Sequence, residues 1–211
     1  MSASASSRKT IIFKEAARIF REKGYNGSSL RDLAKRAGVQ GGSIYHHFSS
    51  KQEILYMIME CTMTTLILNV RQAIEGVERP LDRLRKAIQF HIEYHTIDTD
   101  ETYVTDSELR SLEPANYTKI VALRNRYERV FREIMAEGLA RGEMHIDDVN
   151  LASKALLQMC TGISYWYTPA GEKSISDIAK QYIDLFFWGI CRGKQGRQTG
   201  ESDDRQAHLN R

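Results

Sequence analysis

The sequence predicts an all-α protein of about nine helices. Proline is scarce, with 3 among 211 residues, and apolar residues recur at intervals of three and four along most of the chain. No pair of alternating segments joined by a hairpin turn signal is present. Hydrophobic residues make up 42% of the chain, which is enough for a packed core.

The first helix is expected over residues 8–23, after a small, polar stretch at 1–7 that we expect to be a disordered arm. Gly24 ends this helix. Its inner face is predicted to carry Ile12, Ala16, Ile19 and Phe20. Ser29, with Asp32 three residues later, fits a capping box and starts a second helix.

A third, short helix is expected over residues 41–48, after a turn at Gly38. Gly41 and Gly42 each cost about 1 kcal/mol of helix stability relative to alanine. Two such residues suit a helix whose backbone approaches another molecule closely. Two helices joined by a glycine turn, the first of them started by a capping box, have the layout of a helix-turn-helix that reads DNA.

These residues closely resemble the DNA-binding domain of the TetR family of bacterial repressors. The likeness rests on an ordered set of positions: Ala37-Gly38-Val39, Gly42, Ile44-Tyr45, His47-Phe48 and Lys51, preceded by a helix that reads IIFKEAARIFREKGYNGSSL. Two positions depart from the family pattern. Gln40 stands where the family usually has Ser or Thr, and Gly41 adds a second glycine.

The helix faces and the family motif together predict the DNA contacts. These are Ser29, Gln40, Gly41, Gly42, Ser43, Tyr45, His46 and Lys51. Gln40 and Ser43 are expected to read base edges. Ser29, Tyr45 and Lys51 are expected to hold phosphates, and His46 suits either role.

Beyond residue 50 the pattern predicts six more helices, over residues 51–75, 80–95, 106–112, 116–141, from after Asp148 to before Pro169, and 174–191. The long helix 51–75 is expected to present one apolar stripe, made by Ile54, Ile58, Cys61, Thr65 and Leu68. The inward positions of the helix 116–141 are Ile120, Tyr127, Phe131, Ile134 and Leu139. Residues 97–105 are expected to form a loop, and the charged tail 193–211 is expected to be disordered.

Charge divides the chain into a basic head and a slightly acidic body. Residues 1–60 carry 10 Lys+Arg and 5 Asp+Glu, while the remainder carries 20 and 22. A basic head suits a module that faces phosphates. The expected domains are a DNA-binding domain at 8–53 and a body at 54–192.

The 3 cysteines show no metal or redox spacing, and no signal peptide or membrane helix is expected, so we expect a soluble cytoplasmic protein.

The order of the helices also resembles the TetR family as a whole. The resemblance implies that the body binds a small-molecule effector and dimerises through the helices near 148–168 and 174–191. A dimer places two recognition helices about 34 Å apart, the spacing of a palindromic operator. The resemblance implies no cofactor beyond the effector.

Aromatic and polar residues on the helices of the body are the candidate ligand contacts. They are Phe90, His91, Tyr94, Arg110, Arg124, Tyr127, Met159 and Trp166. Short phrases also resemble the subgroup that responds to acyl-CoA thioesters of fatty-acid and steroid-ring catabolism: Glu108-Leu109-Arg110, Arg124 to Glu128, and Trp166-Tyr167 before Pro169. For such a ligand the guanidinium groups of Arg110 and Arg124 suit the CoA phosphates.

Other functions remain open from the sequence. The effector can instead be a non-CoA hydrophobic compound such as a drug or an aromatic. His91 and His95, four residues apart on one helix, allow a metal sensor. No nucleophile elbow, phosphate-binding glycine loop or metal-hydrolase motif indicates an enzyme. A purely structural DNA-bending protein would not need the aromatic second half.

Overall fold

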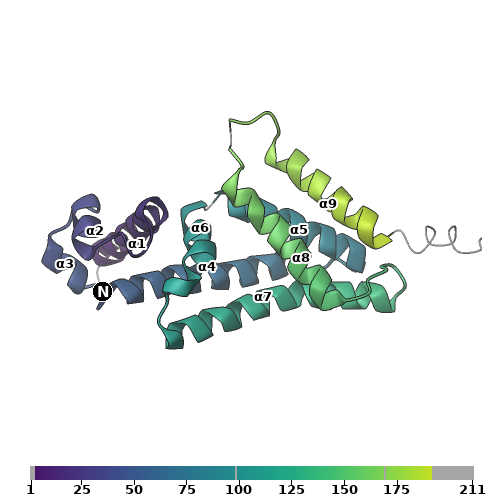
Figure 1. Cartoon of the computed structure of the whole chain (residues 1–211), viewed down its shortest axis with the longest axis horizontal. Helices are drawn as coiled ribbons and strands as arrows, with labels where there is room; N and C mark the ends of the chain where they lie inside the picture. Colours follow the sequence, from purple (N-terminus) through teal and green to yellow (C-terminus); the bar gives the residue numbers. More distant parts are fainter. Residues whose placement is uncertain (1–2, 98, 169, 192–211) are drawn as a thin grey trace, which may run out of the picture.

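The computed structural model describes residues 3–97, 99–168 and 170–191, and within these ranges the chain is helical, without strands (Figure 1). The elements are α1 (Ala3–Lys23), α2 (Leu30–Arg36), α3 (Gly41–Tyr45), α4 (Lys51–Ile74), α5 (Pro80–Ile97), α6 (Thr99–Ser107), α7 (Pro114–Ala140), α8 (Val149–Thr161) and α9 (Ile175–Cys191), with the short 3₁₀ helices η1 (Leu109–Ser111) and η2 (Gly162–Tyr165). The predicted all-α fold with nine α-helices is therefore confirmed for these ranges. The expected disordered tail at 193–211 lies outside them.

The three N-terminal helices form a head at one end of the molecule, and α4 runs from this head into the body (Figure 1). The predicted inner face of α1 is buried, as are Ile44 and Phe48 at α3. The buried cluster of the head does not stop at residue 53. It continues into the first turns of α4 and includes Val104 of α6 and Ile120 of α7.

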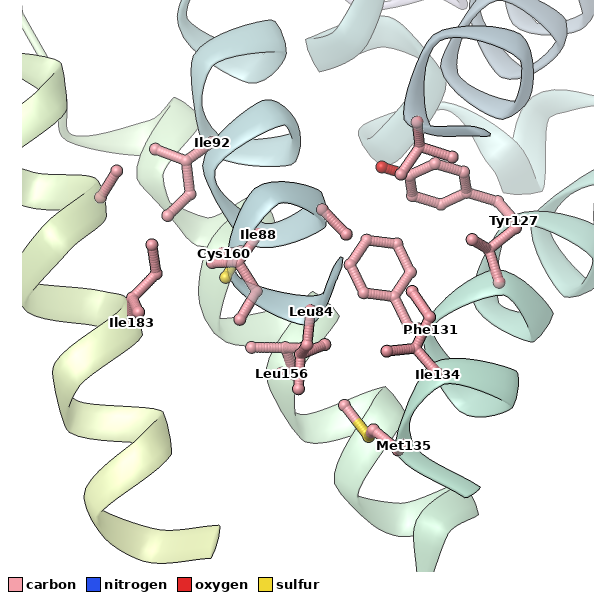
Figure 2. Packing of buried hydrophobic residues seen from close by; sticks show 14 of the residues in the cluster. Leu84, Ile88, Ile92, Tyr127, Phe131, Ile134, Met135, Leu156, Cys160 and Ile183 are labelled. Carbon is pink, nitrogen blue, oxygen red and sulfur yellow. The ribbon is translucent and has the colours of Figure 1, made fainter. Parts of the chain in front are cut away.

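The body packs α4, α5, α7, α8 and α9 around a second buried cluster (Figure 2). In Figure 2, Ile88 and Ile92 of α5 face Leu156 and Cys160 of α8, and Ile183 of α9 closes this side. Phe131 of α7 covers the other side of α5. The deletion of any one such side chain leaves a cavity, at a cost of about 2–5 kcal/mol.

Helix α4 buries a different stripe from the one predicted. Ile54 and Ile58 are buried as expected, whereas Cys61, Thr65 and Leu68 are exposed. The buried positions continue instead through Thr62, Met63, Leu66, Ile67 and Val70. Apolar residues lie around much of this helix, so periodicity alone did not select the buried face.

Helix α4 is also the one described helix whose length and mean hydropathy, 1.3 over its best 18-residue window, would allow it to cross a membrane. The sequence reading expected no such segment. Half of that window is buried, and α4 packs against α1, α5, α6 and α7. It is the central helix of the fold, and a core helix passes the same test of length and composition.

Several predicted boundaries were wrong. Helix α1 begins at Ala3 and not at residue 8, since nothing in the Ala- and Ser-rich stretch breaks the helix. The expected loop 97–105 is mostly the helix α6, whose first turn carries Asp100 and Glu101, the acids that a helix N-terminus favours. Where a separate helix 106–112 was expected, α6 ends at Ser107 and the 3₁₀ helix η1 follows it. Leu139, expected to face inward on α7, is 40% exposed.

Candidate nucleic-acid interface and ligand site

The head folds as the capping signals predict. The Ser29 hydroxyl accepts the N–H of Asp32 at 3.1 Å and caps α2. Gly38 has a φ of +65°, which closes α2, and the next residue, Val39, donates its N–H to Ala34 O at 3.0 Å. Gln40, which stands where the family usually has Ser or Thr, provides no side-chain cap for α3. These bonds fix α3 beside α2 as the second helix of the pair.

Helix α3 exposes its predicted DNA-contacting face. Gln40, Gly41, Gly42 and His46 are exposed, Tyr45 is 64% exposed and Ser43 is half-buried. On the opposite side, Ile44 is fully buried and holds α3 to the head. No acidic residue lies in α3, so this surface suits a phosphate backbone.

Gly41 and Gly42 are not required by packing inside the protein. A Cβ atom added to either residue would meet no other heavy atom within 4 Å. Neither residue has the positive φ that only glycine adopts readily. Packing among the described residues therefore does not explain these two glycines, and the close approach of DNA to their backbone stays a prediction.

Two of the predicted phosphate contacts are already engaged inside the head. The Lys51 ammonium donates to Tyr25 O and Ser28 O, both at 2.7 Å, and lies 4.2 Å from the centre of the Tyr25 ring. Burial lowers the pKa of Lys51. The Ser29 hydroxyl donates to the Asp32 carboxylate at 2.7 Å. Lys51 therefore ties the α1–α2 turn to α4, and a phosphate contact by either side chain stays a prediction.

The predicted ligand residues lie in several separate places. His91, Tyr94 and Tyr127 lie close together in the core, with Phe90 against Tyr94 at a ring separation of 5.7 Å. Arg110 is exposed in η1, and the Trp166 ring lies 6.5 Å from that of Tyr182 of α9. Met159 packs on the edge of the body core. The structure therefore does not bring all eight residues into one pocket.

The core group is a hydrogen-bonded network built around His91. Its ring nitrogens lie 2.9 Å from the Tyr127 hydroxyl and 3.1 Å from the Thr161 hydroxyl. Burial, and then the neighbouring His95, lower the pKa of His91 well below its usual range. Burial likewise raises the pKa of Tyr127 and raises that of Cys160 to about 12, so these groups are neutral near pH 7.

This network argues against a metal site at His91 and His95. Both nitrogens of His91 already have partners, and the two imidazole rings stack with centroids 4.1 Å apart. Among the residues that the structure describes, no three His, Cys, Asp or Glu side chains are grouped as a metal would need.

A second polar group, formed by His95, Asp106 and Arg124, lies one turn along α5 from His91. The sequence did not predict Asp106 as part of the ligand site. Arg124, a predicted ligand contact, donates to Thr105 O and lies 3.7 Å from Asp106 Oδ1. His95 Nε2 lies 3.6 Å from Asp106 Oδ2. Asp106 was predicted as the first residue of a helix over 106–112, and its partners His95 and Arg124 lie 11 and 18 positions away in the chain, beyond the reach of local patterns.

Helix α6 also joins the body to the head. Asp100 pairs with Arg21 at 2.9 Å and with Arg18 at 3.6 Å. Just beyond α6, Glu108 accepts the N–H of Tyr25 at 3.0 Å. An open crevice of about 490 Å³ lies at this junction, lined by Arg18, Arg21, Glu22, Arg36 and Asp100.

Helices α8 and α9 leave large apolar side chains exposed. Leu151 of α8 and Trp166, which directly follows η2, are 66% and 53% exposed, and Leu185 and Trp188 of α9 are 65% and 59% exposed. In Figure 1 these two helices lie on the side of the body away from the head. Large apolar side chains that are exposed together often mark an interface between protein molecules.

Comparison with known sequences assigns both parts of the chain. Residues 12–56 match the family described as bacterial regulatory proteins, tetR family, and residues 77–190 match the tetracyclin repressor-like C-terminal domain. The chain is 26% identical over 190 residues to the HTH-type transcriptional repressor KstR2 of Mycolicibacterium smegmatis, covering 89% of this chain and 93% of that one. It is 29% identical over 181 residues to the fatty acid metabolism regulator protein of Bacillus subtilis, covering 85% and 93%.

Solved structures agree with the fold. The TetR family regulator PfmR of Thermus thermophilus superposes with a TM-score of 0.77 at 34% identity, covering 88% of this chain and 99% of that chain. AibR, solved with isovaleryl coenzyme A and operator DNA, gives a TM-score of 0.79 at 23% identity, covering 84% and 97%. This second likeness shows the shared fold.

Proposed function

Because the chain belongs to the TetR family of transcriptional repressors, which are regulators and not enzymes, we propose that it binds a palindromic operator as a homodimer and leaves it when an acyl-CoA thioester of lipid or steroid catabolism binds the body. The observation that carries the DNA part is the exposed pair Gly41 and Gly42, with open space around both. Such a regulator acts in the cytoplasm, where its operator lies.

The dimer rests on α8 and α9. The side chains of Leu151 and Leu185 are about two-thirds exposed in the protomer, and their burial against a second copy supplies a hydrophobic driving force of about 25 cal/mol per Å². A two-fold axis through these helices gives two heads that can read one palindrome.

The effector class rests on the relatives and on the chemistry of the body. Relatives of nearly full length include the repressor KstR2 and a fatty acid metabolism regulator, and AibR was solved with isovaleryl coenzyme A. An acyl group suits the apolar interior between α5, α7 and α8. Arg110, exposed at η1, is available to a phosphate, whereas Arg124 is engaged with Thr105 and Asp106.

A thermal-shift screen with operator release tests this function. The panel holds acyl-CoA thioesters of several chain and ring types, their free acids, and unrelated aromatic compounds. We expect a thioester, but not its acid, to raise Tm and to release a fluorescent operator in an anisotropy assay. A rise with aromatic compounds alone would move the effector to the non-CoA class, and failure of the protein to bind any operator would overturn the repressor function.

A further inference from the structure

His95 and Asp106 bring a ring nitrogen and a carboxylate oxygen to 3.6 Å, a separation longer than a hydrogen bond. His95 is 3% exposed, and its Nδ1 lies 2.9 Å from the backbone oxygen of His91. A carbonyl oxygen can only accept, so Nδ1 carries the proton of this bond. In the neutral ring, Nε2 is then a bare acceptor.

The atom that faces this nitrogen is also an acceptor. Asp106 Oδ2 lies 3.6 Å from His95 Nε2, is buried, and has no hydrogen-bond partner. The other carboxylate oxygen, Oδ1, lies 3.7 Å from Arg124. A buried carboxylate oxygen without a donor is rare and destabilising, so Asp106 Oδ2 favours the approach of a hydrogen-bond donor.

The surroundings select the kind of donor. The Arg124 guanidinium beside Asp106 already supplies a positive charge, which disfavours a cationic ligand group at the same carboxylate. The position is at the meeting of α5, α6 and α7, next to the apolar core of the body. Tyr165 of η2 lies at the outer side: it is 59% exposed, and burial and then the Asp106 charge raise its pKa.

We propose that His95 and Asp106 form a specificity site that binds a neutral hydrogen-bond donor of the effector, and that for an acyl thioester this donor is a hydroxyl group on the acyl part. This assignment rests on the effector class proposed above. The occupied site also acts on α6, since Asp106 shares this helix with Asp100, which holds Arg18 and Arg21 of the head.

The first test needs no effector. A long-range ¹H–¹⁵N spectrum of histidine-labelled protein at pH 7.5, with the His95 signals assigned through His95→Gln, reports the protonation of the ring. The proposal requires a ring with a single proton, carried on Nδ1. A doubly protonated ring would overturn the proposal, because the extra proton would itself satisfy Asp106.

The second test uses two thioesters that differ by one hydroxyl, octanoyl-CoA and 3-hydroxyoctanoyl-CoA, and the variant Asp106→Asn. The new amide N–H can donate to His95 Nε2 and close the site from within. We expect wild-type protein to bind the hydroxylated probe roughly tenfold or more tightly, and Asp106→Asn to lose this preference without a fall in the Tm of the free protein. Asp147→Asn, which removes the same charge from an exposed position, should keep the preference.

The outcomes separate the two proposals. If Asp106→Asn weakens both probes equally, the donor is an amide of the CoA arm, which supports the site and corrects the assignment to the acyl part. If the variant weakens neither probe, the site is not a ligand contact and the inference is overturned. If neither thioester changes the wild-type Tm, the proposal of an acyl-CoA effector is wrong, and so is the assignment of the donor to an acyl hydroxyl. The histidine spectrum then still reports whether the His95 ring carries one proton or two.

Discussion

At the scale of single residues, the two glycines at the start of α3 separate folding from DNA binding. Gly42→Ala adds a methyl group where no atom lies within 4 Å and where φ is not positive. We expect the free energy of unfolding to stay the same or to rise by up to about 1 kcal/mol, because alanine favours a helix. The operator Kd should rise roughly tenfold, since the methyl group meets DNA.

Thermal unfolding and fluorescence anisotropy measure these two effects. Gly138→Ala in α7 is the contrasting variant, because its Cβ would lie 2.6 Å from Met144 Sδ. This variant should lose about 1–3 kcal/mol of stability and, when folded, bind the operator normally. Unchanged operator affinity in Gly42→Ala would remove the main argument for a close approach of DNA to α3.

Lys51 was predicted to hold a phosphate, and its place in the head leads to a different expectation. Lys51→Met keeps most of the side-chain stem but leaves Tyr25 O and Ser28 O without their donor. We expect a loss of about 1–3 kcal/mol in the free energy of unfolding, measured in urea. If Lys51 only bound a phosphate, the free energy of unfolding would not change. The slope of log K for operator binding against log salt concentration would instead become less steep by ~1.

His91 makes stability depend on pH. Its pKa in the folded protein lies well below 6.5, so below pH 6.5 the unfolded chain binds a proton that the folded chain does not. Stability therefore falls as the pH decreases from 6.5 towards the folded-state pKa, by up to about 1.4 kcal/mol for each pH unit. His91→Gln should lose less stability than wild type between pH 7.5 and pH 5.5 in urea unfolding, and equal losses would contradict a neutral His91.

At the scale of elements, α9 illustrates how one helix can serve both the core and an interface. Ile178, Ala179 and Ile183 are buried in the protomer, while Leu185 is 65% exposed. Leu185→Glu should therefore leave the protomer folded and convert the dimer to a monomer, as measured by analytical ultracentrifugation, with loss of operator binding.

Leu68 of α4 provides the matched control for this change. It is 63% exposed, nearly the same as Leu185, but it lies on another helix. Leu68→Glu should leave the dimer and operator affinity unchanged. If Leu68→Glu and not Leu185→Glu breaks the dimer, the interface lies on α4.

At the scale of the whole molecule, the head and the body share one packed structure. Val104 of α6 belongs to the buried cluster of the head, and Asp100 and Glu108 bind the head at its surface. A shift of α6 in the body therefore moves contacts of α1 directly, in addition to any tilt of α4. The predicted boundary between residues 53 and 54 does not divide the packing.

The double variant Asp100→Ala with Glu108→Ala tests this connection. We expect an effector to release the operator less completely, because α6 no longer holds the α1–α2 part of the head. The operator Kd measured with and without the effector should become more similar. Glu93→Ala, whose carboxylate meets Gln89 on the surface of α5, should leave the response unchanged. An unaltered response in the double variant would assign the coupling to α4 alone.

The sequence by itself determined the helical fold and the helix-turn-helix, because both rest on local signals. The Ser29 cap and the positive φ of Gly38 involve residues within a few positions of one another. The same holds for the exposed face of α3, since Ile44 and Phe48 fix which side is buried. Family likeness then supplied the partners that these local signals imply.

Only the tertiary structure decided which long-range partners the polar groups take. Lys51 binds carbonyl groups 26 and 23 positions away, and Asp106 meets His95 and Arg124 from two other helices. The buried stripe of α4 and the helix α6 were likewise decided by packing, since α4 is apolar on several sides and α6 is stabilised by Val104 in the core of the head. Local periodicity cannot report such contacts, because their free energy comes from neighbours that are distant in the chain.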